Sequence, residues 1–286
     1  MDPMDRLMPI GLIVTGAIAL ITLSPAAQAQ RTEDYQYWAD RCREEVGTIG
    51  LEACEKAIEL DDRDPALWLN RGVKYDRDLR EPNRALVSYR EAIQRDPDQN
   101  YALAWYNQCA VLLKLANDPR NNDPEILLPI FTELELITDE TTPTERELFA
   151  SNRTLLYESV VKSCDRALNG DDNWGTASPA RAWNNIGYAK DELGQYQAAL
   201  TAYENALAAD PNHINALNNK GITLENLNRH AEALAAYDTA LALDTNHEKA
   251  RRNRARLLQL QPNLETDPPE IEDPETPEAP ETDPED

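Results

Sequence analysis

Apolar and small residues recur at helical spacing through most of the chain, and from Ala180 onward their pattern repeats after 34 residues. The matching pairs are Trp183 and Leu217, Gly187 and Gly221, Ala199 and Ala233, Tyr203 and Tyr237, Ala206 and Ala240, and His213 and His247. A fixed period of this length predicts supersecondary units that stack on one another. The chain is therefore expected to be a repeat protein.

Each unit contains the residues that a close pair of helices needs. Gly187, Ala199 and Ala206 are small and lie at helical spacing, so two helices can approach each other closely. Trp183 and Tyr203 are large enough to fill the gaps between neighbouring helices. The sequence thus predicts a helical hairpin as the repeating unit.

The spacing W-x3-G-x11-A-x3-Y-x2-A-x4-P, which runs from Trp183 to Pro211, resembles the tetratricopeptide repeat family. This resemblance implies two antiparallel helices per repeat, stacked into a right-handed superhelix with a concave groove that binds peptides. The predicted fold class is an all-α solenoid of about five helical hairpins with a C-terminal capping helix.

Tryptophans align the remaining copies. If Ala180 is counted as the first place of a repeat, Trp38, Trp68, Trp105 and Trp183 all fall at the fourth place. The predicted repeats span 34–62, 65–98, 102–169, 180–213 and 214–247, and the capping helix spans 248–260. The second repeat carries one inserted residue. The third is split by about forty extra residues, in which the apolar segment 124–138 predicts one added helix.

Residues 1–29 resemble a signal peptide. Arg6 precedes an apolar run from Ile10 to Leu23, and Ala27-Gln28-Ala29 supplies the small-x-small pattern that signal peptidase needs. We expect cleavage after Ala29 and export to the periplasm or another extracytoplasmic compartment. The alternative is an uncleaved N-terminal membrane anchor, although the run is shorter than the ~20 residues that a spanning helix requires.

The charge of the chain narrows the possible partners. The net charge is -24, and residues 261–286 contain eleven Asp or Glu and no Lys or Arg. This Pro-rich acidic tail is expected to be disordered, because it cannot bury enough apolar surface to offset the entropy of ordering. Residues 30–260 carry a further -12. The charge argues against binding to nucleic acid or an anionic membrane, and no membrane insertion is expected after signal cleavage.

Four cysteines occupy two equivalent pairs of repeat places. Cys42 and Cys109 take the eighth place, and Cys54 and Cys164 take the twenty-fourth, where the two helices of a hairpin face each other. In an exported protein this arrangement predicts the disulfides Cys42–Cys54 and Cys109–Cys164, out of three possible connectivities. The alternative is four small buried residues in a reducing compartment. A metal site is not expected, since C-x-x-C spacing is missing from the sequence.

An asparagine recurs at the sixth place, which the family resemblance places in the groove. The residues are Asn70, Asn107, Asn185, Asn219 and Asn253. An amide can both donate to and accept from the backbone of an extended peptide, so these residues form a candidate peptide-binding ladder. The alternative is that they only make contacts within the repeats.

The predicted capping helix adds positive charge to the same groove. Lys249, Arg252 and Arg256 fall at its second, fifth and ninth places. This face resembles part of the carboxylate clamp of tetratricopeptide co-chaperones, but Asn184 and Tyr188 in the preceding repeats depart from that motif. The acidic tail begins nearby, which suggests that it occupies the groove until a partner displaces it. Alternatively, these residues are simply cations on a solvent-exposed terminal helix.

Chemistry-bearing motifs are missing from the sequence. GxGxxG, GxxxxGK[ST] and GxSxG do not occur, and the three histidines fall in predicted turns. We therefore predict no catalytic residues and no cofactor, and expect a scaffold or assembly factor that binds a protein or peptide partner. A different function, binding of a small ligand or glycan between 124–138 and Trp174, stays open, as does homo-oligomerisation.

Overall fold

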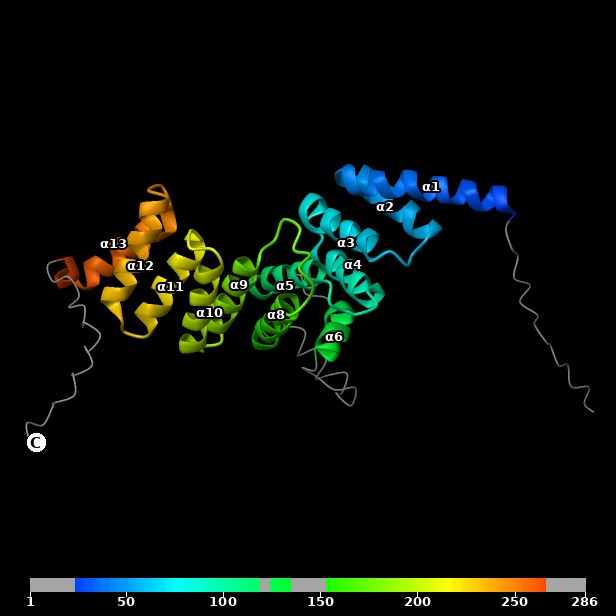
Figure 1. The fold of residues 1–286 in the computed structure, drawn as a ribbon. Helices are drawn as coiled ribbons and strands as arrows, with labels where there is room; N and C mark the ends of the chain where they lie inside the picture. The colour runs from blue at the N-terminus through cyan, green and yellow to red at the C-terminus, as the bar shows by residue number, and fades with distance from the viewer. Residues whose placement is uncertain (1–23, 119–123, 135–152, 266–286) are drawn as a thin grey trace, which may run out of the picture.

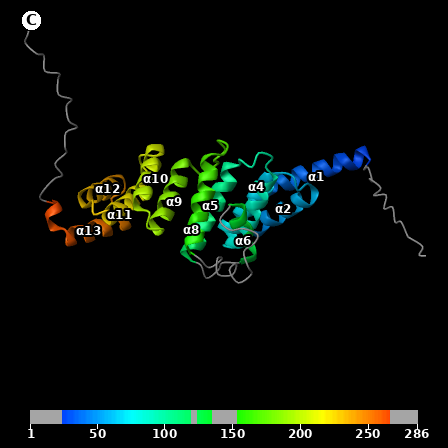
Figure 2. The ribbon, with the colours of Figure 1, turned by 90° about the horizontal axis from the view of Figure 1, so that it is seen from below.

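The structure, a computed structural model, describes residues 24–118, 124–134 and 153–265 of the chain. Helices follow one another in a curved single file, with α1 at one end and α13 at the other (Figure 1). The same order runs along the length of the molecule when it is viewed from below (Figure 2). This arrangement confirms the predicted all-α solenoid.

The described residues form five helical hairpins and a closing helix. The first three pairs are α1 (Pro25–Glu44) with α2 (Gly47–Leu60), α3 (Pro65–Val73) with α4 (Pro82–Arg95), and α5 (Ala102–Asn117) with α8 (Arg153–Leu168). The last two are α9 (Pro179–Glu192) with α10 (Tyr196–Ala209), and α11 (Ile214–Asn226) with α12 (His230–Leu243). The C-terminal end consists of α13 (Glu248–Leu260) and the short 3-10 helix η3 (Pro262–Glu265).

The first helix begins earlier than the sequence predicted. It starts at Pro25 and not at Asp34, because the Ser24 hydroxyl accepts a hydrogen bond from the Ala27 backbone N–H at 3.3 Å and proline is favoured in the first turn. The first five residues of α1 thus belong to the predicted signal segment. The apolar run before them, residues 135–138 of the predicted added helix and the tail 266–286 lie outside the described residues.

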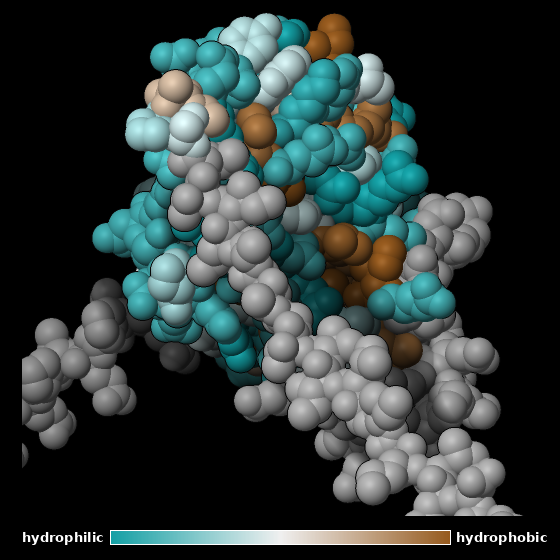
Figure 3. Space-filling view, turned by 90° about the vertical axis from the view of Figure 1, so that its right-hand side faces the viewer, coloured by the Kyte–Doolittle hydropathy of each residue, from teal (hydrophilic) through white to brown (hydrophobic). Residues whose placement is uncertain are grey.

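The two ends of the array differ. Leu264 of η3 packs on the hydrophobic cluster of α12 and α13, so the last hairpin is covered. At the α1 end, hydrophilic side chains make up most of the visible face and hydrophobic ones gather in separate patches (Figure 3). Tyr37, Val46 and Ile49 of the first hairpin are exposed. Among the described residues, no helix precedes α1 to cover this end.

A glycine packed against a tyrosine ring closes three of the five hairpins. A Cβ added at Gly72, Gly187 or Gly221 would lie 2.4 to 2.6 Å from the ring of the tyrosine at the twenty-fourth place, which is Tyr89, Tyr203 or Tyr237. Each of these rings is at most 1% exposed. Because a side chain at the glycine would overlap the ring, glycine sets how closely the two helices approach.

Disulfides take the place of this contact in the other two hairpins. Cys42 bonds to Cys54 between α1 and α2, and Cys109 bonds to Cys164 between α5 and α8. The Cα atoms are 4.5 and 5.3 Å apart, within the range of an ordinary disulfide. The pairing is the one that the repeat places predicted.

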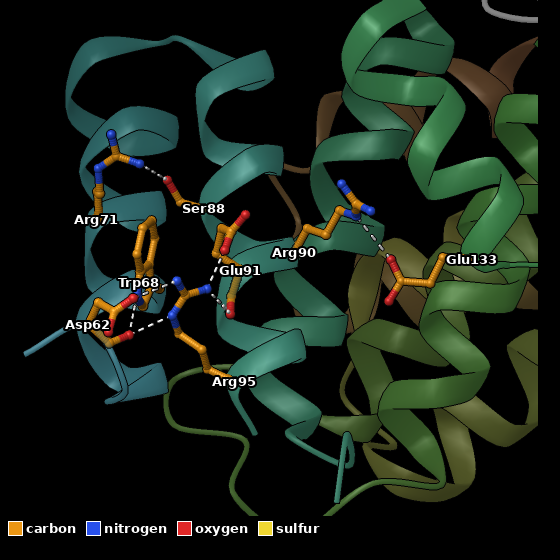
Figure 4. A network of polar contacts seen from close by, with 8 residues as sticks. All are labelled: Asp62, Trp68, Arg71, Ser88, Arg90, Glu91, Arg95 and Glu133. Carbon is orange, nitrogen blue, oxygen red and sulfur yellow. Dashed lines mark hydrogen bonds and ion pairs between the residues drawn. The ribbon is translucent and has the colours of Figure 1, made fainter. Parts of the chain in front are cut away.

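The fourth-place tryptophan ties each early repeat to the turn before it. The indole Nε1 of Trp68 donates to the Asp62 carbonyl oxygen at 2.9 Å, and Trp105 makes the same bond to the Gln99 carbonyl oxygen. Arg95 lies over the Trp68 ring and pairs with Asp62 at 3.2 Å (Figure 4). A planar guanidinium can stack on the ring and bind a carboxylate together.

The inserted residue of the second repeat is absorbed by a π-helical segment. It spans Lys74–Leu79 and ends at Arg80, whose φ of 58° is left-handed. A single extra residue widens one turn, and this is the usual origin of a π-helical bulge. The hairpin therefore keeps its packing on both sides of the insertion.

The insertion in the third repeat contributes one described helix, α6 (Pro124–Glu133). Arg90 of α4 forms an ion pair with Glu133 at 3.2 Å (Figure 4), and Lys162 of α8 donates to the Leu134 carbonyl oxygen at 2.5 Å. Leu127, Ile130 and Phe131 are buried, as is Leu134. The added helix is therefore docked on the second helices of repeats two and three.

An acidic residue bridges successive repeats at or next to the twelfth place. Asp76 pairs with Lys114 at 2.7 Å and Glu225 pairs with Arg256 at 2.8 Å, whereas Asp191 accepts from the uncharged Thr223 hydroxyl at 2.7 Å. The Tyr203 hydroxyl also donates to Asp191, at 3.0 Å. Burial raises the pKa of Asp191 to about 6. The bridge between repeats four and five is therefore the one of the three without a cation.

Removing the disulfides should weaken the first and third repeats unequally. The chain-entropy model gives about 3 kcal/mol for the short Cys42–Cys54 loop and about 4 kcal/mol for the longer Cys109–Cys164 loop, whose cysteines are 12 and 55 residues apart. Urea unfolding of the two Cys-to-Ala double variants, followed by circular dichroism, measures the loss. Unchanged unfolding midpoints in both variants would contradict the structural role.

Asp191→Asn should stabilise the protein at neutral pH. The folded pKa lies above the ordinary value of 3.8, so the contribution of Asp191 to stability is greatest below pH 4 and is lost as the pH rises through about 6. The substitution removes this loss, about 2 kcal/mol after allowance for the partial contact with water. Thermal unfolding between pH 4 and 8 should show a flatter profile for the variant.

Glu225→Gln is the matched control for this experiment. It breaks the ion pair with Arg256 at the equivalent place, so it should lower the melting temperature at pH 7 and not raise it. If both variants change stability in the same direction, the missing cation at Asp191 is not the cause.

Candidate functional site

The first helices of repeats four and five and the closing helix lie side by side. α9 contacts α11, and α11 contacts α13. The second, fifth, ninth and thirteenth places of these three helices follow one side of each helix, since their spacing is close to the helical period. We call these twelve places the first-helix face.

The first-helix face is positively charged, although the protein is acidic. It holds four cations (Arg181, Lys249, Arg252 and Arg256), four asparagines (Asn184, Asn215, Asn218 and Asn226), one acid (Glu192) and three other residues (Tyr188, Ile222 and Leu260). The acid is paired with Arg153 at 3.3 Å. The face therefore carries a net +3 in a chain of net charge -24.

Asparagine side chains form a continuous hydrogen-bonded chain across the three helices. Asn253 Nδ2 donates to Asn218 Oδ1 at 2.9 Å, Asn218 donates to Asn219 at 3.2 Å, and Asn219 donates to Asn184 at 3.2 Å. Two members, Asn219 and Asn253, are sixth-place residues named from the sequence. The other two, Asn184 and Asn218, were missed, although the Asn-Asn pairs that contain them are visible in the sequence.

The remaining sixth-place asparagines lie elsewhere. Asn185 directs its amide toward the Cys109 sulfur at 4.0 Å, and Asn70 is half-buried on α3. Asn107 is only 7% exposed, because it is packed within the third hairpin. It therefore offers its amide to no partner, and the predicted five-residue ladder is reduced to the chain across α9, α11 and α13.

The cations of α13 lie on the surface. Lys249 and Arg252 are exposed, and Arg256 is half-exposed while it pairs with Glu225, which also accepts from the Tyr237 hydroxyl at 2.5 Å. The predicted basic side of the closing helix is thus present in the structure. Its one internal ion pair is the bridge to repeat five.

Two of the three histidines, His213 and His247, have structural roles. The Nδ1 atoms of His213 and His247 each accept a backbone N–H at 3.2 Å, from Ala216 and Ala250, and so cap the first turns of α11 and α13. Burial lowers the pKa of His213, which favours this neutral, accepting form. Within the described ranges, no group of three or more His, Cys, Asp or Glu side chains could hold a metal ion.

The suggested small-ligand site is not assembled as predicted. Trp174 lies against Tyr106 of α5, with ring centroids 6.2 Å apart, while α6 is docked on α4 and α8. Beside α6 there is instead an open hollow of about 530 Å³ between Leu134, Lys162 and Arg166.

In the part of the chain that the structure describes, no helix is long and apolar enough to cross a membrane.

Comparison with known proteins identifies the repeats. Residues 179–248 match the family model described as "Tetratricopeptide repeat". None of the curated proteins matches the chain. The match covers α9 to the start of α13, where the repeat pattern of the sequence is clearest.

Solved structures of MamA share the fold. A MamA RS-1 double mutant is 17% identical with a TM-score of 0.53, and the alignment covers 75% of this chain and 95% of that one. MamA from Desulfovibrio magneticus RS-1 is 19% identical with a TM-score of 0.50, covering 76% and 97%. MamA AMB-1 is 14% identical with a TM-score of 0.52, covering 77% and 94%.

These identities are low, so the likeness to MamA concerns the fold alone. The family model and the stacked hairpins agree with the repeat pattern of the sequence. Residues 179–248 are therefore tetratricopeptide repeats within an all-α solenoid.

Proposed function

We propose that this protein is an extracytoplasmic scaffold that holds a segment of a partner protein on its first-helix face. The observation that carries the proposal is the amide chain from Asn253 to Asn184, flanked by exposed cations on α13. Asn184, Asn219 and Asn253 are half-buried, and each keeps a second N–H or lone pair beyond those used in the chain, whereas Asn218 is only 3% exposed and links the others. Such groups can bind the backbone of an extended segment without reading its sequence.

Export is supported by the cysteines and by the position of the cleavage motif. All four cysteines are in disulfides, which persist in oxidising compartments. Residues 24–34 are exposed, so cleavage after Ala29 would remove part of α1 that packs on little else. The buried residues Ala39 and Cys42 would stay in place.

The acidic tail is a second element of the proposal. It begins with η3, directly after α13, and its eleven carboxylates, one of them on Glu265 of η3, would be present near the cations of α13 at an effective concentration of order millimolar. We propose that it competes with the partner for this end of the face. A chain that ends at Glu265, and so keeps Leu264 of η3 on the last hairpin, should then bind its partner more tightly than the full chain. This difference in affinity should decrease as salt increases.

A small-ligand or glycan site remains the second candidate function. The hollow beside α6, with Lys162, Asp165 and Arg166 in its lining, is the observation that favours it. A thermal-shift screen separates the two functions, because a ligand of the hollow would raise the melting temperature by linkage. A scaffold would respond to protein partners only.

Blocking α11 should abolish partner binding. Asn215 and Asn226 are exposed at the second and thirteenth places, so Asn215→Arg with Asn226→Arg puts two long side chains on the face without touching the core. Partners captured on the oxidised chain from an extracytoplasmic extract, and counted by mass spectrometry, should fall at least tenfold. A tenfold loss of affinity corresponds to about 1.4 kcal/mol of binding free energy, and we expect it because the two arginine side chains would sterically exclude the partner from the face.

The control places the same two changes on the other side of the hairpin. Ala235 and Thr239 are exposed on α12, and Ala235→Arg with Thr239→Arg should leave capture unchanged. Equal loss in both variants, or capture by neither the full chain nor the shortened chain, would contradict binding at the first-helix face.

The mature protein should begin at Gln30. Expression of the full chain in a host with signal peptidase, followed by intact-mass measurement, tests both the cleavage and the two disulfides, since each disulfide removes two hydrogens. A protein that keeps residues 1–29 and sediments with membranes would instead support the anchor.

A further inference from the structure

The third place of each later first helix packs on the second helix of the repeat before it. In three of these joints the third-place residue shares a buried cluster with the alanine at the twenty-seventh place of that second helix: Leu67 with Ala57, Ala216 with Ala206, and Ala250 with Ala240. At the other two joints the third-place residues, Ala104 and Ala182, are buried as well. The third place is therefore a contact position between successive repeats.

An ion pair accompanies this contact in the same three joints. A cation at the seventh place pairs with the acid at the twenty-fifth place of the preceding second helix: Arg71 with Glu55 at 3.6 Å, Lys220 with Glu204 at 3.4 Å, and Arg254 with Asp238 at 2.5 Å. Where the seventh place is uncharged, at Gln108 and Ile186, no such pair can form. The second helices of the three paired joints thus share the motif acid-x-Ala.

The first helix of the array presents the same two places without a second helix in front of them. Tyr37 at the third place of α1 is 54% exposed, although its equivalents are buried. Arg41 at the seventh place donates to the Tyr37 hydroxyl at 3.2 Å and lies 3.5 Å from Glu45 of the same helix. Among the described residues, α1 is the first helix and lies at one end of the array (Figure 1). The end of a stacked array exposes the surface that a further repeat would bury.

The internal joints indicate which element fits this surface. The preceding second helix supplies an acid to the seventh place and an alanine near the third, so the fitting element is a helix with the same motif. Four of the second helices, α2, α4, α10 and α12, are 14 residues long, which gives the expected length. Because the ring of Tyr37 is larger than the leucine or alanine of the later repeats, a small residue opposite it is favoured.

The described helices of a second copy do not supply this element. Each second helix already packs against the first helix that follows it, in the pairs α2 with α3, α4 with α5, α8 with α9, α10 with α11 and α12 with α13. A second copy would have to open one of these joints to offer its acid-x-Ala motif. The occupant is therefore assigned to a different protein.

We propose that the outer side of α1, defined by Tyr37 and Arg41, docks an amphipathic helix of a partner protein that carries an acid-x-Ala motif. The docked helix would extend the array by one element, with its acid on Arg41 and its alanine beside Tyr37. This proposal goes beyond the proposed function, because the third and seventh places of α1 are not part of the first-helix face. With both surfaces occupied, the scaffold would join two partners.

A peptide with the sequence of α10 is the probe, because it carries the motif at Glu204 and Ala206. Short isolated helices are marginal in water, so its side chains at 197 and 201, both exposed in α10, are linked by a staple. Binding of the fluorescein-labelled peptide to the oxidised chain is measured by fluorescence anisotropy in about 50 mM salt, where exposed charges are weakly screened. Failure of this peptide to bind would overturn the proposal.

A charge exchange tests the pairing with Arg41. Arg41→Glu in the chain should weaken the peptide about fivefold, and Glu204→Lys in the peptide should weaken binding to the unaltered chain by the same factor, since an exposed ion pair contributes up to this much. The two changes together should restore the affinity. If the exchanged pair binds no better than the single changes, Arg41 does not meet the acid. Thermal unfolding checks that each variant is folded.

Arg43→Glu is the matched control for this exchange. Arg43 is exposed at the ninth place of α1 and pairs with Asp40 at 3.1 Å, so the variant makes the same change of charge on another side of the helix. It should leave the affinity for the peptide unchanged. If it weakens the peptide as much as Arg41→Glu does, the binding is diffuse attraction to α1, and the docking surface is overturned.

Two further variants separate this surface from the other places that a helix could occupy. If Ala255→Arg, at the exposed eighth place of α13, abolishes binding while Arg41→Glu has no effect, the peptide completes the last repeat and the proposal is wrong. If the α11 variant Asn215→Arg with Asn226→Arg abolishes it, the peptide lies on the first-helix face, and the proposal is again wrong. Capture of partners on that face is a separate measurement, so the scaffold function stands or fails independently.

Discussion

The contact between the eighth and twenty-fourth places is the constraint on which every hairpin of this solenoid depends. Where it is a glycine against a buried tyrosine ring, the fit depends on the missing side chain, because a single added carbon would overlap the ring. Where it is a pair of cysteines, a covalent bond takes over the same role. The first and third hairpins lack the tyrosine. The first hairpin lies at the end of the described array, and the third is split by an insertion. The disulfides thus lie in the two hairpins that packing alone would stabilise least.

Between hairpins, polar bridges add to the apolar contacts. Asp76, Asp191 and Glu225 each reach from one hairpin to the first helix of the next, but only two of them meet a cation. A carboxylate held by hydroxyl groups in a buried place costs free energy when it ionises, and this cost raises the pKa of Asp191. Repeats four and five therefore meet at a joint whose stability depends on pH, directly beneath the amide chain of the candidate site.

The array of hairpins is interrupted between repeats three and four. A solenoid of identical repeats would present one uniform face along its whole length, since each repeat contacts mainly its neighbours. Here Trp174 and Gly175 of the segment 170–178 pack on Tyr106 and Leu103 of α5, so the first-helix face begins at α9. The positive charge of these helices stands out because the rest of the chain is acidic, and long-range repulsion disfavours anionic ligands elsewhere on the molecule. The first-helix face is therefore a short, positively charged surface on a long, acidic solenoid.

Periodicity along the chain was enough to predict the helices, the hairpins, the cysteine pairs and the closing helix, because small and aromatic residues at fixed places can pack in only one way. The tryptophans gave the register even where the third repeat is split. The sequence could not show that Asn107 is buried, that Asn184 and Asn218 complete the amide chain, or that Trp174 lies on Tyr106. These facts depend on contacts between residues that are far apart in the sequence or in different repeats. Local spacing determines which side of a helix a residue occupies, but only the tertiary structure decides what covers that side.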